Sequence, residues 1–188
     1  MASRTPARLV TDVLNPFAIF TALFLAVALA KSPVSRASLY TGVELLAAAA
    51  VAGFVFLMRR RARVGDFWIS ARAERLAPAV FLLFAFVALL ATLWLLGAPA
   101  GLLLLTLSMG LASAAVALLT LLFKASAHCT VAGHAATAGI ILLGPPGLVF
   151  ALALPLVVWS RVTLGAHTLP ETLAGAVVGV GFAALFLL

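Results

Sequence analysis

The sequence predicts an all-α integral membrane protein, built as a bundle of six to seven transmembrane helices. Three observations favour this fold class. Hydrophobic residues make up 65% of the 188-residue chain and charged residues only 9%, whereas a soluble domain carries roughly 25% charged residues. The apolar runs are about 15 to 25 residues long, which suits helices that cross roughly 30 Å of hydrocarbon. These runs also lack the polar–apolar alternation of membrane barrels.

The apolar runs follow one another along the chain, separated by short polar loops and turns. The first run could be a signal peptide, but it lacks a small-residue cleavage site and six further runs follow, so we interpret it as a retained anchor. Six spans remain possible if this run lies in the membrane interface. The expected spans are residues 16–30, 39–58, 79–96, 101–123, 129–143, 148–159 and a last one that begins near Pro170.

Turn signals delimit several of these spans. Residues 97–99 and 144–147 combine glycine with proline, and neither pattern can continue a helix. Pro170 suits the first turn of the last helix. Small residues such as those at 175–179 permit close helix packing, which we expect within one bundle rather than in a dimer. No linker, repeat or second domain is visible, so we expect residues 1–188 to form a single transmembrane domain, of unknown oligomeric state.

The positive charges indicate the orientation in the membrane. With seven spans, the N-terminus and the loops at residues 59–78, 124–128 and 160–170 share one face. That face carries ten Lys and Arg residues, and the other carries only Lys31 and Arg36. Since cytoplasmic loops hold the excess of positive charge, we expect the first face to be cytosolic. Topology and anionic lipid explain the net charge of +7, so nucleic acid is not an expected partner.

Polar side chains gather in the loops of this face. The three histidines fall on or near it, and the third, fifth and seventh spans begin there. The N–H groups and dipoles at those helix N-termini favour an anion. Basic residues precede the three starts, namely Arg75, Lys124 and Arg161. Because such side chains suit phosphate oxygens, a phosphate or another small oxyanion is the expected ligand.

His167 and Glu171 are four residues apart. If the last helix begins near Thr168, Glu171 lies in its first turn and can reach back to His167. A carboxylate bound to one ring nitrogen fixes the tautomer and makes the other nitrogen more nucleophilic. His128 lies beside Ser126 and is positioned to protonate a leaving oxygen.

Each of these features also has a purely structural interpretation. An isolated His-x-x-x-Glu pair is more often a helix cap or a loop hydrogen bond. His134 lies one to two turns inside the fifth helix, where a histidine more often packs or bonds internally. Only the conjunction of the polar loops on one face favours a functional site.

Together these residues resemble the type 2 phosphatidic acid phosphatase superfamily, whose members are integral membrane lipid phosphatases and related enzymes. One family signature is Ser-Arg, five residues, His, three residues, Asp. Ser160, Arg161, His167 and Glu171 match its spacing, with Glu in place of Asp. The Leu-Ala-Gly that follows, at residues 173–175, is also similar to the family.

The other two signatures are matched more loosely. For Pro-Ser-Gly-His, one placement keeps Ser126 and His128 and the other ends at His134; we prefer the first, which lies at the membrane boundary. For Lys, six residues, Arg-Pro, the nearest match ends at Arg75. Trp68 occupies the lysine position, and the nearby Arg72 is the basic residue that stands in for the lysine. The resemblance covers about residues 60–182, a phosphatase-like core that follows the N-terminal spans of residues 1–58.

The resemblance implies a metal-independent lipid phosphatase without a cofactor. His167 is then the nucleophile that forms a phosphohistidine, Glu171 orients it, and His128 protonates the leaving lipid alcohol, with His134 as the alternative acid. The implied substrate is a polyprenyl phosphate or diphosphate, phosphatidate or phosphatidylglycerophosphate in a prokaryotic plasma membrane. The orientation expected from the positive charges places its phosphate on the cytosolic leaflet. The residues implied in phosphate binding are Arg161, Arg75, Lys124, Ser126, Arg72 and Ser160.

Two other functions remain open on the sequence. A metal-binding protein or transporter would use His128, His134, His167 and Glu171 as nitrogen and oxygen ligands of zinc or a similar ion. A non-catalytic membrane scaffold would share the fold alone. Phosphate release in the presence of a chelator separates the phosphatase from the metal protein, and the His167→Ala variant separates it from the scaffold.

Overall fold

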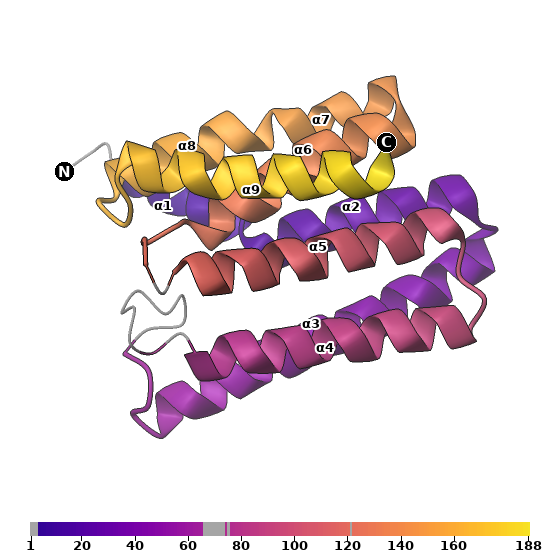
Figure 1. The fold of residues 1–188 in the computed structure, drawn as a ribbon, viewed down its shortest axis with the longest axis horizontal. Helices are drawn as coiled ribbons and strands as arrows, with labels where there is room; N and C mark the ends of the chain where they lie inside the picture. The colour runs from indigo at the N-terminus through magenta and orange to yellow at the C-terminus, as the bar shows by residue number, and fades with distance from the viewer. Residues whose placement is uncertain (1–3, 66–73, 75, 121) are drawn as a thin grey trace.

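The structure is a computed structural model that describes residues 4–65, 74, 76–120 and 122–188. The helices run roughly along one axis and form a bundle (Figure 1). Its elements are α1 Arg4–Val13, α2 Pro16–Lys31, α3 Val34–Arg60, α4 Leu76–Leu95, α5 Ala100–Leu119, α6 Ala127–Leu143, the 3-10 helix η2 Pro145–Gly147, α7 Leu148–Ala151, α8 Ala153–Thr163 and α9 Leu169–Leu187.

The length and composition of these helices agree with a membrane bundle. Within the described ranges, five helical segments are long and apolar enough to cross a membrane, and α1 with α2 makes a sixth if this bent pair counts as one span. The two helices meet at an angle of 44°, where the Asn15 side chain caps α2 by accepting a hydrogen bond from the Ala18 N–H. The shorter apolar helix α6 would be the seventh span, so that number stays a prediction.

One helix outside the expected spans was not predicted, and one predicted loop was wrong. The polar N-terminal stretch forms the helix α1, which packs against α8. Ser160 and Arg161, expected in a loop, lie in the last two turns of α8, which continues to Thr163. The loop before α9 is therefore only residues 164–168. Helix hydrogen bonding continues through polar residues wherever their side chains find partners, so hydropathy alone misses such ends.

Three further boundaries also differ from the prediction. α3 begins at Val34, five residues earlier than expected, and α5 already ends at Leu119. The expected span 148–159 is divided into α7 and α8, and the 3-10 helix η2 precedes it. By contrast, the predicted turns at residues 97–99 and 144–147 are confirmed, and Gly97 and Gly144 adopt φ values of +69° and +67° there, which suit glycine.

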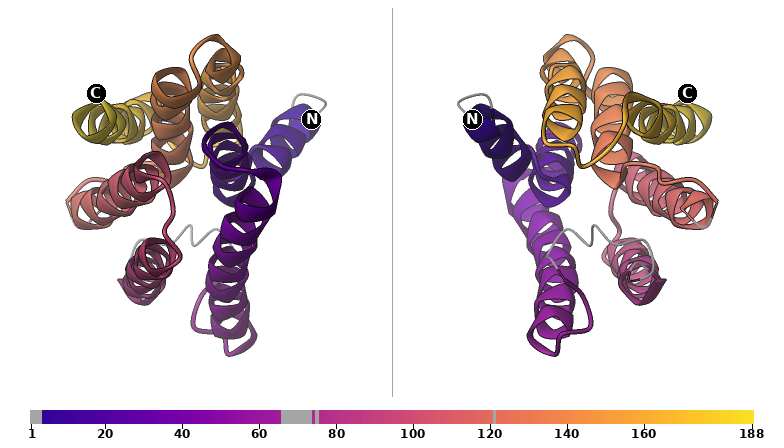
Figure 2. Two further views of the ribbon diagram at one scale, coloured as in Figure 1. Left: turned by 90° about the vertical axis from the view of Figure 1, so that its right-hand side faces the viewer. Right: turned by 90° about the vertical axis from the view of Figure 1, so that its left-hand side faces the viewer.

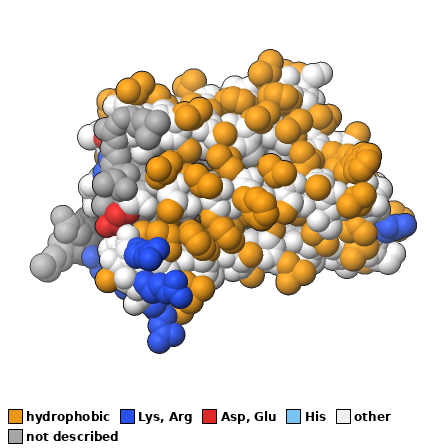
Figure 3. All heavy atoms as spheres, turned by 60° about the horizontal axis from the view of Figure 1, so that its bottom comes forward, with side chains coloured by type: hydrophobic (Ala, Val, Ile, Leu, Met, Phe, Trp, Pro, Cys, Tyr) orange, Lys and Arg blue, Asp and Glu red, His pale blue; other side chains and the backbone are white. Residues whose placement is uncertain are grey.

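The outer surface is largely apolar along the helices and basic at its ends. Figure 3 shows this on the side of the bundle that α3 and α4 form. Exposed basic side chains include Arg59, Arg60, Arg61 and Arg63 at one end and Lys31 and Arg36 at the other. The charges thus lie where lipid headgroups or water can solvate them. Which end faces the cytosol stays a prediction.

Small residues allow α6 and α9 to pack very closely. Viewed end-on, these two helices lie side by side with α5 next to them, while α3 and α4 form the opposite side of the bundle (Figure 2). A Cβ atom at Gly179 would lie 2.0 Å from the carbonyl oxygen of Thr130, and one at Gly175 would lie 2.3 Å from that of Ser126. Only glycine permits such approaches. The expected use of these residues for packing within one bundle is confirmed.

Candidate active site

The polar loops meet at one end of the bundle. The C-terminal ends of α3, α5 and α8 lie at this end together with α1 (Figure 1). Two predicted phosphate-binding residues, Arg72 and Arg75, lie outside the described residues. The described part of the site consists of the starts of α6 and α9 and the end of α8. The close packing of α6 against α9 brings these segments together.

The turn between α8 and α9 folds back onto the end of α8. Gly165 adopts a φ of +67°, a conformation that reverses the chain after a helix and favours glycine. The backbone N–H groups of Ala166 and His167 both donate to the carbonyl oxygen of Arg161, at 3.1 and 3.3 Å. This turn fixes His167 directly beside the basic end of α8.

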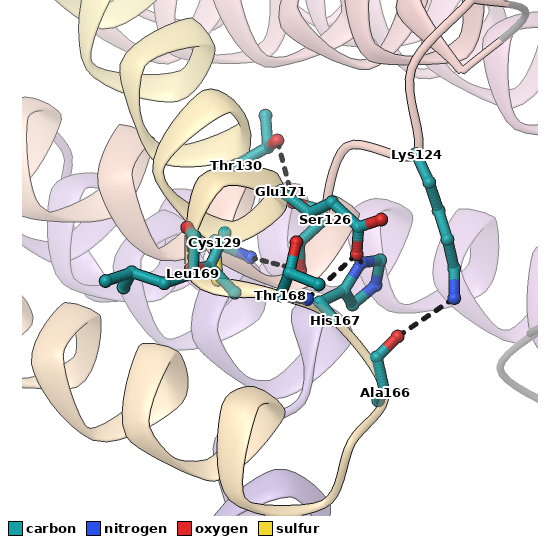
Figure 4. Close-up of polar contacts among 10 residues, drawn as sticks. Lys124, Ser126, Cys129, Thr130, Ala166, His167, Thr168, Leu169 and Glu171 are labelled. Carbon is teal, nitrogen blue, oxygen red and sulfur yellow. Dashed lines mark hydrogen bonds and ion pairs between the residues drawn. The ribbon is translucent and has the colours of Figure 1, made fainter.

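The imidazole of His167 is held by Glu171. Its Nδ1 lies 3.2 Å from Oε2 of Glu171, and the same oxygen accepts the backbone N–H of Thr168 at 2.9 Å (Figure 4). Thr168 is the N-cap of α9 and Pro170 lies in its first turn, so the predicted helix start is confirmed. Because a carboxylate only accepts hydrogen bonds, Nδ1 carries the proton and Nε2 keeps its lone pair.

His167 is held in the neutral form at pH 7. The residue is only 8% exposed. Burial, together with the positive charges of Arg161 and Lys124, lowers the pKa of His167 to about 4, against the opposing effect of Glu171. A buried neutral imidazole with one fixed nitrogen is chemically suited to nucleophilic attack.

Lys124 and Ser126 tie the start of α6 to the α8–α9 turn. Lys124 Nζ donates to the carbonyl oxygen of Ala166 at 3.1 Å, which places the ammonium group beside His167 (Figure 4). The backbone N–H of Ser126 donates to the carbonyl oxygen of Glu171 at 3.1 Å. The Ser126 hydroxyl caps α6 by accepting the Cys129 N–H at 3.4 Å. The resemblance implies phosphate binding at Ser126, but its backbone N–H is engaged by Glu171 in this structure.

His128, Arg161 and His167 converge on one cavity. Its volume is about 750 Å³, and these three side chains are its basic lining, with Ala166 beside them. All three are buried. The charge of Arg161 interacts with both imidazoles. The remaining lining comes mainly from apolar side chains of α2 to α5, so the cavity has one polar end and a long apolar part.

Two other predicted site residues face away from this cavity. Nε2 of His134 lies 2.8 Å from the Ser108 hydroxyl, and both side chains are fully buried between α6 and α5. The Ser160 hydroxyl donates to the carbonyl oxygen of Ala7 at 2.6 Å and also bonds to the hydroxyl of Thr11. Neither His134 nor Ser160 belongs to the cavity lining. This geometry favours His128 over His134 as the second histidine beside the cavity, and the Ser160 hydroxyl instead joins the end of α8 to α1.

The four residues considered as metal ligands do not form a common site. In the part of the chain that the structure describes, no three His, Cys, Asp or Glu side chains gather in a way that could hold a metal ion. His134 is engaged with Ser108, whereas His167 is engaged with Glu171. Among the described residues, these four side chains are therefore not arranged as one ligand shell.

Two features of the site were missed in the sequence. The first is α1, whose residues Ala7 and Thr11 hold the end of α8. These two buried residues are four apart, a spacing that is typical of one face of a helix. The second is the apolar cavity with Glu44 in its wall. A single glutamate in an apolar run was a signal for a functional position, but no periodicity indicates a cavity.

Comparisons with known proteins add no neighbour to this picture. No family model, curated protein or solved structure matches the chain. Any statement about function must therefore come from the chemistry of the residues at the site.

Proposed function

We propose that the protein is a membrane lipid phosphatase that hydrolyses the phosphate ester or diphosphate of a lipid through a phosphohistidine. One observation carries this proposal. A buried imidazole, His167, is fixed by Glu171 at the basic end of an otherwise apolar cavity, with Arg161 and His128 beside it. Basic groups suit a phosphate and the apolar lining suits the hydrocarbon attached to it.

The reaction follows from the positions of the two histidines. Nε2 of His167 attacks phosphorus, an N–P bond forms, and the bond between phosphorus and the lipid oxygen breaks. The leaving oxygen takes a proton from His128, whose charged form the bound phosphate stabilises. His128 then removes a proton from water, the water oxygen attacks phosphorus, and inorganic phosphate leaves His167. Glu171 stabilises the positive charge that the imidazole of His167 carries while it is phosphorylated, and Arg161 with Lys124 neutralises the phosphate oxygens.

The apolar part of the cavity supports a lipid as the substrate. Side chains from four helices line it, including Phe20, Val51, Leu83 and Val116. A water-soluble phosphate ester gains nothing from such a lining, whereas a hydrocarbon tail is stabilised there. Because only a lipid gains from the apolar lining, we prefer lipid phosphates to water-soluble phosphate esters as substrates.

The test is phosphate release by the purified full-length protein in detergent or vesicles. The substrates are prenyl phosphates and diphosphates, phosphatidate and phosphatidylglycerophosphate, each with and without a chelator. Release that persists with the chelator is expected. Activity that vanishes with the chelator and returns with zinc favours the metal protein, and no release from any of these lipids favours the scaffold.

The pH profile is a second expected result. Because His167 must be neutral to attack and its pKa is about 4, kcat/KM should fall on the acid side with an apparent pKa near 4 rather than near 6.5. Unfolding takes up a proton on this histidine between those values, so stability should also decrease as the pH falls from about 6.5 to 4.

The Glu171→Gln variant checks the origin of this acid limb. Since Glu171 opposes the lowering of the His167 pKa, its neutralisation should move the acid limb to still lower pH. It should also reduce kcat by about 10²-fold or more, because the tautomer is no longer fixed. Asp12→Asn, at an exposed carboxylate on α1 at the same end, is the control and should keep the wild-type profile. An acid limb near 6.5 in the wild type contradicts the proposed state of His167.

A further inference from the structure

The cavity extends from its basic end towards the middle of the bundle. Contacts between α2, α3, α4 and α5 show how deep it reaches. The ring of Phe20 packs edge-on against Phe86, with centroids 5.8 Å apart. Phe86 in turn borders Gly110, where a Cβ atom would lie 3.3 Å from that of Phe86. Next to Phe20, the hydroxyl of Thr21 lies 2.9 and 3.0 Å from the two carboxyl oxygens of Glu44. These residues of α2, α3, α4 and α5 therefore share one depth in the bundle.

The cavity ends at this depth. The large side chains that follow along the same helices are buried in the core and do not belong to the lining. These core residues are Leu23, Phe24, Tyr40, Leu93 and Leu105. Interiors packed in this way leave no room for a further chain. We call the lining residues Phe20, Glu44, Phe86, Leu89 and Met109 the floor of the cavity.

The helix rise gives the depth of the floor. Along α5 and the residue that follows it, the lining extends from Met109 to Thr120, and along α3 from Glu44 to Val55. Eleven residues separate the members of each pair, which corresponds to about 16 Å at about 1.5 Å per residue. An extended chain advances roughly 1.2 Å per bond, as the polypeptide backbone does. The cavity can therefore hold a chain of about 13 bonds.

Glu44 makes this floor polar. Its side chain is 3% exposed and lines the cavity, and Thr21 is the hydroxyl beside it. A buried carboxyl group needs hydrogen-bond partners, and covering it with hydrocarbon costs free energy. A tail that ends short of Glu44 leaves room for water at the carboxyl group, whereas a longer tail displaces that water without replacing its hydrogen bonds.

We propose that Glu44, held by Thr21, limits the length of the lipid tail, so that the preferred substrates are lipid phosphates whose tail in the cavity has about 12 to 14 chain atoms. The phosphate headgroup in this proposal rests on the proposed function. The tail length rests on the packed floor of the cavity and on the carboxyl group of Glu44. Tails of this length fill the cavity, and longer ones must cover Glu44 or leave the cavity.

The test uses n-alkyl phosphonates with 8 to 20 carbon atoms, whose carbon–phosphorus bond cannot be hydrolysed by this reaction. Their binding to the full-length protein is measured as Kd in one detergent. In the wild type, affinity should peak at 12 to 14 carbons and be at least fivefold weaker at 18, the effect expected from covering one polar group. In Glu44→Leu this penalty should disappear, and in the matched polar variant Glu44→Gln it should persist.

A second variant keeps the proposal testable if Glu44→Leu fails to fold. Met109→Ala shortens a fully buried floor side chain, and the optimum should move to longer tails. The same length profile in the wild type and in both floor variants overturns the inference, whether or not phosphate is released. A length optimum that depends on Glu44, without release from the matching alkyl phosphates, supports the inference and contradicts the proposed phosphatase.

Discussion

Replacing His167 with glutamine is expected to reduce phosphate release by about 10³-fold or more, because the variant has no nucleophile to form the phosphohistidine. Glutamine is close to histidine in size, and its amide can still approach Glu171, so the fold should persist. The measurement is kcat with the preferred lipid phosphate, together with the thermal unfolding temperature. The wild type should also form an acid-labile, base-stable phosphoenzyme during turnover, and the variant should not.

His134→Gln is the matched control for this variant. His134 is as deeply buried and lies on α6, but its Nε2 bonds to Ser108 and its side chain lies outside the cavity lining. The control should lose some stability and keep its phosphoenzyme. His128→Ala should form the phosphoenzyme slowly and accumulate it, since both the leaving oxygen and the attacking water lose their proton-transfer partner. Full activity of His167→Gln excludes the proposed mechanism, and loss in His134→Gln with an active His128→Ala reverses the choice between these two histidines.

Hydropathy and turn chemistry predicted most of the fold. Apolar runs placed the long helices, and the glycine–proline combinations near Gly97 and Gly144 placed the turns. The errors lie where polar residues are helical. Ser160 stays in α8 because its hydroxyl bonds to Ala7 and Thr11 of α1. The local composition around Ser160 cannot reveal partners that lie about 150 residues away in the sequence. The amphipathic pattern of α1 was visible but was obscured by its charges.

Residue spacing along the sequence predicted the central pair of the site, but it did not predict contacts between residues that are far apart in the sequence. The pair His167 and Glu171 was accessible because four residues along a helix start bring two side chains together. Glu44 and Thr21, by contrast, are 23 residues apart on two helices, and nothing local specifies their contact. The cavity is a property of how helices are spaced, which depends on packing across the whole bundle.

The second large effect is expected at Gly179, where α9 crosses α6. A Cβ atom there would lie 2.0 Å from the carbonyl oxygen of Thr130 and 2.8 Å from the backbone nitrogen of His134. Both of these atoms belong to the backbone of α6, which cannot move aside as the end of a flexible side chain can. Gly179→Ala must therefore push the two helices apart. We expect a loss of about 3 kcal/mol of stability, and a decrease of roughly 6 to 12 °C in the thermal unfolding temperature for a chain of this size.

Gly181 provides the control, because it lies on the same helix and a Cβ atom there would meet no other atom within 4 Å. Gly181→Ala should be neutral or slightly stabilising, by up to about 1 kcal/mol, since alanine favours the helix. The α6–α9 contact also sets the distance between His128 at the start of α6 and His167 before α9. Gly179→Ala should therefore lose more activity at temperatures where it remains folded than Gly181→Ala does. A wild-type unfolding temperature in Gly179→Ala contradicts this close packing, and with it the way in which the two histidines are brought to one cavity.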